Sequence, residues 1–525
     1  MKRFPCPPLW SVGVLVLLVL FGWAARQVWS RARPARDGEV TLRIAHWQLE
    51  AGVQRGLDAV AAEFEARNPG VKIEILRIPE RVYPQWLITQ FVGGTAPDLI
   101  ELRMATPVEQ KVRYLELLGE VVEAPNPYNA GTPLADVPWR ETFVDGMRGG
   151  FDEALGDHFG APAFLSTVRL FYNRRLLRDI TGGEEAPRTL AELLDLCDRT
   201  EAWSRRENRP ILSIAGSSYN APYLFDALMR AQLHRMGNAF SPRPRLNAEA
   251  EAFFAAHLRG DWTFEHPDVR RTLALQREFG RHMQPGFLQL RREDATFAFT
   301  QQRALMIATG SWDATSLREE CDFPVGVVAI PAPTADDPKW GEGVLGKVSE
   351  EGTGAFGPFG IARASKHPEL ALSFLQFLTS QEANRLFSRL SGWLPVIDGV
   401  DAPEDVEPFM PALAGYPGAP SLRYGIEAKQ AYERNLHALF SPSGGVDAFI
   451  AQTAENFRAG VEQDLRRSLR SRERMLRQTD SVFEGWRQLE RIEDSEEARR
   501  RRRMLGEAQI DQEIEAAWLR WELGR

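Results

Sequence analysis

Residues 93–102 read Gly-Gly-Thr-Ala-Pro-Asp-Leu-Ile-Glu-Leu, and this stretch decides the fold because it ends a helix and begins a buried strand. Gly94 can adopt the left-handed conformation that stops a helix, and Pro97 has no N–H with which a helix could resume. The apolar residues in 99–102 then predict a short strand. We expect the preceding helix to cover residues 83–91.

A matching helix–strand pattern lies upstream. Apolar residues alternate over residues 40–44 and again over 71–75, which predicts two strands. Between them, residues 57–64 place apolar side chains at helical spacing, and Asn-Pro-Gly at 68–70 ends that helix. The order β-α-β-α-β predicts a mostly parallel α/β sheet with right-handed crossovers. Ligands of such sheets bind beyond the carboxyl ends of the strands.

Composition restricts the class of protein. The chain has 525 residues, enough for two or three domains, and its net charge of −8 argues against general nucleic-acid binding. Its three cysteines, Cys6, Cys197 and Cys321, have no metal or redox spacing. We interpret Cys197 and Cys321 as buried free thiols in preference to a disulfide.

An uncharged apolar segment covers residues 9–25, after Lys2 and Arg3. Its length suits a signal sequence or a membrane span, and the absence of a small-x-small cleavage pattern favours an uncleaved anchor. We expect the bulk of the chain to lie on the periplasmic or extracellular face of the cytoplasmic membrane. A single span cannot form a channel, so a role in transport needs partners.

Five segments occur in the order typical of one family. They are residues 64–73 with the Asn-Pro-Gly turn, residues 94–99, Gly-Ala-Pro at 160–162 with Phe-Tyr-Asn at 171–173, residues 299–312, and residues 360–395. Together they resemble the bacterial extracellular solute-binding proteins of the sugar-binding ABC-importer type, which are maltose-binding-protein-like. The resemblance covers roughly residues 40–455.

The resemblance implies an α/β, two-lobe periplasmic-binding-protein-like fold with an interdomain cleft and a hinge. We assign residues 1–37 to the anchor and an Arg-rich linker, and residues 456–525 to a helical C-terminal extension. The first lobe is predicted to comprise residues 38–160 with about 305–355, and the second residues 161–304 with about 356–455. The chain would cross between lobes near 161–164, 309–311 and 354–359.

A sugar site needs flat aromatic rings to stack on apolar C–H faces, and charged or amide groups to bind hydroxyls. On these grounds we select candidates at strand ends and lobe crossings, each with packing or a surface ion pair as its alternative. The candidate ligand-binding residues are Trp47, Tyr83, Glu101, Arg103, Tyr219, Asn220, Trp312, Asp313, Phe356, Trp393, Arg423 and Tyr424. Trp312 is the first choice among them.

The leading hypothesis is a receptor that delivers a solute to an ABC permease, without catalysis, cofactor or metal. We expect that solute to be a sugar or oligosaccharide. The alternative is a membrane-anchored sensor or scaffold that uses the same fold, favoured by the anchor and the helical extension. A third reading, a carbohydrate-active enzyme, has no supporting motif in the sequence. We expect a monomer unless the helical extension pairs. Arg77 and Arg103 favour an anionic sugar such as a uronate.

Overall fold

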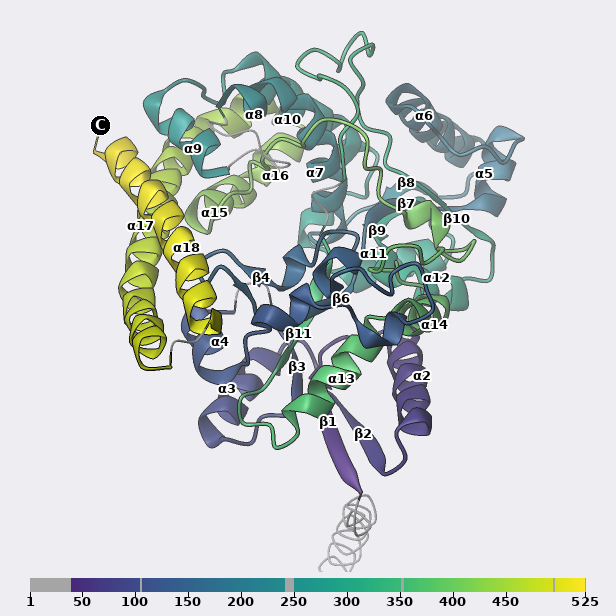
Figure 1. The fold of residues 1–525 in the computed structure, drawn as a ribbon. Helices are drawn as coiled ribbons and strands as arrows, with labels where there is room; N and C mark the ends of the chain where they lie inside the picture. The colour runs from purple at the N-terminus through teal and green to yellow at the C-terminus, as the bar shows by residue number, and fades with distance from the viewer. Residues whose placement is uncertain (1–38, 104–105, 241–249, 351–353, 494–495, 525) are drawn as a thin grey trace, which may run out of the picture.

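A computed structural model describes residues 39–103, 106–240, 250–350, 354–493 and 496–524. Two sheets organise it (Figure 1). The first sheet has the order β2 (Val71–Arg77), β1 (Val40–His46), β3 (Leu99–Glu101), β11 (Phe356–Ile361), β6 (Ala161–Phe164). The second has the order β10 (Val325–Val328), β7 (Val168–Asn173), β9 (Ala304–Gly310), β8 (Leu212–Ala215). Each sheet forms the centre of one lobe.

The predicted β-α-β-α-β unit is present. Strand β1 pairs in parallel with both β2 and β3. Helix α3 (Tyr83–Gly93) ends at Gly94, whose φ of 64° is the left-handed conformation expected there. A Cβ added at Gly94 would meet nothing within 4 Å, so the glycine is selected by backbone conformation and not by crowding. Strand β3 follows after Pro97, as the sequence indicates.

Helices cover both sheets. In the first lobe these are α2 (Ala51–Arg67), α3, α4 (Val108–Tyr114), α13 (Pro368–Leu378) and α14 (Gln381–Ser391). The second lobe has α5 (Arg174–Thr181), α6 (Leu190–Arg206), α7 (Asn220–Gln232), α8 (His234–Phe240), α9 (Ala250–Arg259), α10 (Pro267–Arg281), α11 (Arg292–Thr300), α15 (Glu427–Arg434) and α16 (Leu436–Phe440). Helix α12 (Ala314–Glu320) follows β9 and packs against α2.

Short segments complete the fold. The single-turn helices are η1 (Gly119–Glu123), η2 (Pro127–Asn129), η3 (Trp139–Thr142), η4 (Arg148–Gly150), η5 (Phe287–Gln289), η6 (Ser311–Asp313) and η7 (Glu407–Phe409). Strands β4 (Phe151–Asp152) and β5 (Asp157–His158) form a small hairpin. The expected C-terminal extension is an antiparallel helical pair, α17 (Val446–Glu493) and α18 (Glu496–Leu523), along one side of the molecule (Figure 1).

Three strands pair in the other sheet from the one that the predicted division of the chain implies. Residues 305–355 were expected in the first lobe, but β9 and β10 both pair with β7 in the second sheet. Residues 356–455 were expected in the second lobe, but β11 pairs with β3 and β6 in the first. Strand β9 is buried at every position and β11 at all but one, so their apolar sequences suit the centre of either sheet.

The predicted N-terminal anchor, residues 9–25, lies outside the described residues, as does Cys6. Within the described ranges, we find no helix with the length and apolar character needed to cross a membrane. Cys197 and Cys321 are both free thiols, as expected; Cys197 is buried and Cys321 half-buried.

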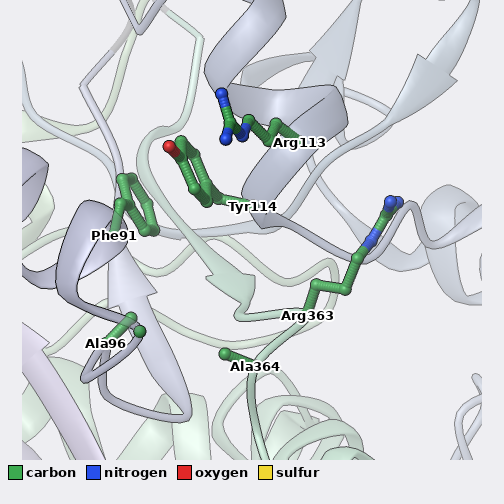
Figure 2. A pocket seen from close by; sticks show the side chains of 7 residues that line it. Phe91, Ala96, Arg113, Tyr114, Arg363 and Ala364 are labelled. Carbon is green, nitrogen blue, oxygen red and sulfur yellow. The ribbon is translucent and has the colours of Figure 1, made fainter.

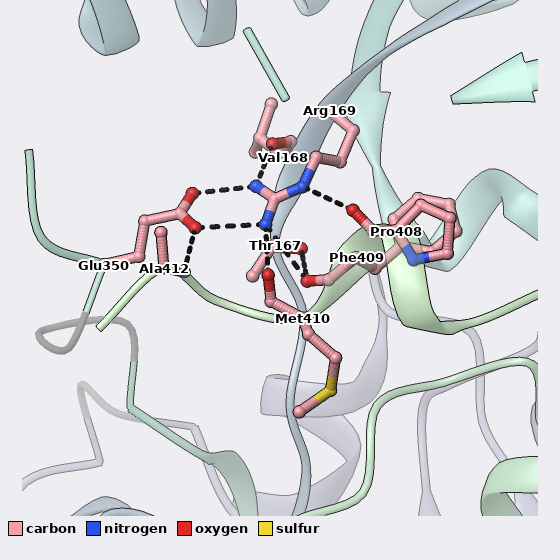
Figure 3. Close-up of polar contacts among 8 residues, drawn as sticks. All are labelled: Thr167, Val168, Arg169, Glu350, Pro408, Phe409, Met410 and Ala412. Carbon is pink, nitrogen blue, oxygen red and sulfur yellow. Dashed lines mark hydrogen bonds and ion pairs between the residues drawn. The ribbon is translucent and has the colours of Figure 1, made fainter. Parts of the chain in front are cut away.

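The segments that connect the lobes meet at one buried guanidinium (Figure 3). In the described part of the chain the crossings are residues 165–167, the connection from β10 to β11, and the segment that runs from α14 through η7 to Met410. Arg169, which is 2% exposed, stands beside the first crossing and forms a bidentate pair with Glu350 of the second, at 2.7 and 3.0 Å.

The same guanidinium binds the third crossing. Arg169 donates to the carbonyl oxygens of Pro408 (3.0 Å), Phe409 (3.1 Å) and Met410 (2.8 Å). The carboxylate of Glu350 also accepts a hydrogen bond from the backbone N–H of Ala412 at 2.8 Å. Because a guanidinium is a rigid fork of five N–H donors, it can hold several segments at once in a fixed arrangement. We call this set of contacts the hinge network.

Replacing Arg169 with alanine should therefore destabilise the whole protein. The change removes the donors to one partly buried carboxylate and four carbonyls, those of Val168, Pro408, Phe409 and Met410. Loss of one member of a buried ion pair costs about 3–5 kcal/mol. Urea unfolding should show that decrease in the free energy of unfolding. Arg466→Ala is the matched control, since Arg466 forms an exposed pair with Glu462 on a single helix and should cost at most about 1 kcal/mol. Equal effects of the two substitutions would contradict the role given to the hinge network.

Candidate ligand-binding site

Polar and aromatic side chains follow the ends of β1 and β3 in the first lobe, and another group lies at the end of β9 and the starts of α7 and α11 in the second. The first lobe contributes Trp47, Glu50 and Glu101, and the second contributes Tyr219, Tyr223, Arg292, Trp312 and Asp313. The charges of Arg292 and Asp313 are close enough to act on the pKa of Glu50, which burial raises. We call these eight residues the interlobe cluster.

Glu101 is the buried centre of the first-lobe half. Its side chain is fully buried; Gln48 Nε2 donates to Oε1 at 2.8 Å and the Trp47 backbone N–H donates to Oε2 at 3.2 Å. Burial outweighs these two hydrogen bonds and raises the pKa of Glu101 to about 8. Gly357 lets β11 pass over it, because a Cβ there would lie 2.8 Å from Glu101 Oε1. Glu101 is therefore mainly protonated at neutral pH.

Tyr83 supports this half from the core and does not face a ligand in this arrangement. It is 1% exposed, and its hydroxyl donates to the Glu101 carbonyl oxygen at 2.8 Å. Its ring packs against the half-buried Trp47, with centroids 5.0 Å apart. Tyr83 thus holds Trp47 in place, a supporting role that strand-end position alone does not reveal.

The second-lobe half is a row of aromatic rings. Tyr219 lies 5.3 Å from Tyr223, which lies 5.6 Å from Trp312, between ring centroids. Gly310 is required beside Trp312, because a Cβ at that position would come within 2.2 Å of the indole ring. The final residue of β9 therefore leaves room for a flat ring against the backbone.

A charged pair completes the second-lobe half. Arg292, at the start of α11, forms an ion pair with Asp313, and its guanidinium lies 5.0 Å from the centroid of the Tyr219 ring. Thr309 Oγ1 donates to Asp313 Oδ2 at 2.6 Å, which fixes the carboxylate. Charged groups beside flat rings are the combination that binds sugar hydroxyls and C–H faces.

Both halves carry buried polar atoms that have no hydrogen-bond partner among the described residues. These atoms are Glu50 Oε2 in the first lobe, and Trp312 Nε1 and Ser311 Oγ in the second. Leaving a buried donor or acceptor unpaired costs about 1–3 kcal/mol, so such atoms need an explanation. An acceptor from one lobe and donors from the other are groups that the hydroxyls of a bound solute would satisfy.

The remaining predicted residues do not join the cluster. Asn220 is buried and donates to the Ala308 carbonyl oxygen at 2.9 Å, which ties α7 to β9. Arg103 is exposed, with its guanidinium 3.8 Å from Glu80.

The other predicted residues lie in packed regions. Arg423 pairs with Asp226 and Glu433, and Tyr424 stacks on Phe254 at 4.3 Å, so both belong to the packing around α15 and α17. Trp393, 2% exposed, packs on Phe164 and the half-buried Phe356 in the core between the lobes.

Three members of the interlobe cluster are not among the residues predicted from the sequence. Tyr223 lies one helical turn after Tyr219, a spacing that sequence could have revealed. Glu50 immediately precedes α2. Its position shortly after the first predicted strand is the sequence feature that could have marked it as a candidate ligand-binding residue. Arg292 lies in a helical region with no motif, and only the fold brings it to Asp313. Arg77, which with Arg103 suggested an anionic sugar, is instead paired with Asp58.

A hollow of about 230 Å³ lies elsewhere, on the outer surface of the first lobe (Figure 2). Phe91 and Tyr114 stack within it, with ring centroids 4.6 Å apart, and Arg113 and Arg363 lie at its edge. Sites for small molecules usually occupy about 300–1,000 Å³, so this hollow is small for an oligosaccharide. We do not assign the solute site to it.

Among the described residues, one group of potential metal ligands comes together in the second lobe. Asp198 and Glu201 of α6 and His282, which follows α10, present ligand atoms within 4.8 Å of one another. His282 Nδ1 lies 2.6 Å from Glu201 Oε1, so the described contact is a hydrogen-bonded pair that ties α6 to the end of α10. We assign this group a structural role.

Glu101 provides a pH test of the buried first-lobe half. Its pKa rises from 4.5 in the unfolded chain to about 8 in the folded protein, so the folded state binds more protons between these values. Stability contributed at this site should fall as pH rises from 5 to 8, by at most about 1.4 kcal/mol per pH unit.

The Glu101→Gln variant should lose that slope, because glutamine does not titrate. The measurement is the free energy of urea unfolding at intervals from pH 5 to 8, with the slope compared between variant and parent. A constant offset between the two proteins would reflect altered hydrogen bonding. Identical slopes would show that Glu101 does not titrate in this range.

Comparisons with known proteins agree on the family. A family model described as bacterial extracellular solute-binding protein matches residues 59–412. A putative binding protein of Brucella abortus (strain 2308) is 22% identical over 416 residues, covering 74% of this chain and 81% of the relative.

Solved structures share the fold. A chitin oligosaccharide binding protein superimposes with a TM-score of 0.55 and 16% identity, covering 81% of this chain and 99% of the other. The maltose-bound MalE3 of T. maritima gives a TM-score of 0.53 and 19% identity, covering 80% of this chain and 99% of the other. At these identities the likeness establishes the two-lobe fold.

Proposed function

Because the chain belongs to the bacterial extracellular solute-binding proteins, we propose that its solute is a carbohydrate, bound by the interlobe cluster and passed to an ABC permease. The family works on the outer side of the cytoplasmic membrane, so the receptor would collect its solute there. The single observation that carries the proposal is the interlobe cluster itself, which combines an aromatic row in the second lobe with buried polar atoms of both lobes that lack partners among the described residues.

The chemistry of the cluster suits a neutral sugar. Trp312 and Tyr223 supply flat faces for the C–H side of a pyranose ring. The Trp312 N–H and the Glu50 carboxyl supply a donor and an acceptor for hydroxyls, one from each lobe. The structural relatives named above are described as binding chitin oligosaccharide and maltose, which supports the same solute class.

Binding would proceed by lobe closure without chemistry. Each lobe alone offers only half of the contacts, so the solute binds most tightly when the lobes approach, and it shifts the population toward that arrangement. The permease would recognise the closed form. The half-buried positive charge of Arg292 is already balanced by Asp313, which favours a neutral solute over a uronate.

A second candidate is a membrane-anchored sensor or scaffold. It is favoured by the helical extension, whose two helices lie beyond the residues that the family model matches. This reading uses the same fold but does not require the interlobe cluster to bind a sugar. Nothing in the family or its structural relatives favours an enzyme.

Thermal unfolding of the full chain, purified in detergent, distinguishes the two. A sugar present at 100 times its dissociation constant should add about 2.7 kcal/mol to stability. The panel contains maltose, maltotriose, chitin oligosaccharides and galacturonate. We expect at least one neutral oligosaccharide to raise the midpoint temperature of unfolding, and we expect Trp312→Ala to abolish that rise.

Trp521→Ala serves as the matched control, because Trp521 is 53% exposed on α18 and lies outside the cluster. It should keep the full response to the sugar. If no sugar stabilises the parent protein, or if the Trp312 variant responds as well as the parent, the carbohydrate receptor is contradicted and the scaffold reading is favoured.

A further inference from the structure

The helical extension is built into the second lobe at one end. Phe457, Val461 and Leu465 of α17 and Leu519 of α18 are fully buried, in a core shared with α9 and α15. The Asp464 carboxylate accepts hydrogen bonds from the backbone N–H groups of Ile426, Glu427 and Ala428 at 2.9–3.0 Å, at the start of α15. This end of the helical pair therefore moves with the second lobe.

Ion pairs reinforce that attachment on both helices. Arg472 of α17 pairs with Glu251 of α9 at 2.8 Å, and Glu522 of α18 pairs with Arg259 of α9 at 2.8 Å. Arg458 donates to the carbonyl oxygens of His257 and Leu258 at the end of the same helix. The pair is held by apolar burial and charge together.

The opposite end of the pair rests on the first lobe. Arg500 Nε of α18 lies 3.3 Å from Glu120 Oε1 of η1. A Cβ at Gly119 would lie 3.1 Å from the guanidinium groups of both Arg500 and Arg501, so the two arginines lie directly on this turn. Their charges also act on Asp157 of β5, whose pKa burial raises and these arginines lower.

Backbone packing accompanies these charges. Gly156, with a φ of 61°, lies beneath α18, and a Cβ there would come within 2.8 Å of the Met504 carbonyl oxygen and 3.4 Å of Ala508 Cβ. The helix therefore meets the β4–β5 turn at close range. Figure 1 shows the pair running from α9 of the second lobe to the region of β4 and α4 in the first.

We propose that the α17–α18 pair is a strap that holds the two lobes at a set angle, and that its contact with Gly119, Glu120 and Gly156 is the end that releases. The two attachments differ in kind. The second-lobe end buries large apolar side chains, whereas the first-lobe end rests on a narrow contact whose Arg500 and Glu120 side chains are 26% and 54% exposed. A partly exposed ion pair contributes less than buried apolar packing and is screened by salt, so this end breaks first.

The strap changes how such a receptor works. Lobe movement in a two-lobe receptor is ordinarily limited by the crossing strands, but here it also requires α18 to leave the first lobe. Any partner that binds the first-lobe end would then control the lobe angle. The inference rests on contacts within this chain and not on the identity of the solute.

Distance measurement by pulsed electron paramagnetic resonance tests the strap in the full chain without added sugar. Spin labels are placed at Val92→Cys in the first lobe and Arg205→Cys in the second, both exposed positions. Cys6 and Cys321 are replaced by serine, and Cys197 is buried at 0% exposure and does not react. The parent should give one narrow distance distribution, and Arg500→Ala with Arg501→Ala should give at least a twofold broader one.

Charge reversal sharpens the test. Glu120→Arg should broaden the distribution as well, and combining Glu120→Arg with Arg500→Glu should restore the narrow one. Arg466→Ala, which removes an arginine from α17 away from the first lobe, should leave it unchanged. The strap is refuted if the Arg500 and Arg501 double variant keeps the parent distribution, or if Arg466→Ala broadens it equally.

Discussion

A single buried guanidinium determines how the two lobes are joined. Arg169 sits beside one crossing, pairs with Glu350 on the second and binds three carbonyl oxygens of the third (Figure 3). Burying a charge is costly, and only several well-aligned hydrogen bonds offset that cost. The hinge network therefore favours one mutual arrangement of the crossings, and it determines where β7 and β9 leave the hinge.

The interlobe cluster depends on that arrangement. Strand β9 ends at Gly310, so its direction sets the position of Trp312 and Asp313, while β1 and β3 set Trp47 and Glu101. The largest apolar core runs continuously from α2 through the crossings to β7 and β9, so the lobes pack against each other in this structure. A site shared between lobes is then a consequence of the connections, and each lobe alone lacks half of it.

Local features of the fold were predictable and long-range ones were not. Gly94 and Pro97 mark a helix end through backbone conformation, which is a property of adjacent residues. The sheets in which β9 and β11 pair could not be predicted, because a largely buried strand has the same apolar sequence in either sheet.

The candidate site shows the same contrast between local and long-range features. Trp312 was recognisable from the Gly-Ser-Trp sequence at a strand end, and Glu101 from its place on β3. Arg292 was missed because nothing near it in the sequence indicates its ion pair with Asp313. Arg423 and Tyr424 are instead engaged with Glu433 and Phe254, partners that are distant from any motif and that only the fold brings to them.

The helical extension separates this chain from its structural relatives, which are covered almost completely by about four-fifths of it. The hinge network and the strap then act on the same motion from two sides, and the interlobe cluster lies between the lobes that they position. A receptor restrained in this way would bind its solute and report the result through the lobe angle.

The most direct test of this account is a crystal structure grown with the oligosaccharide that stabilises the protein most. We predict a sugar ring on the face of Trp312, with its hydroxyls bonded to the Trp312 N–H and to Glu50. A sugar bound only in the outer hollow beside Phe91 and Tyr114, with the interlobe cluster unchanged, would contradict the assignment of the site.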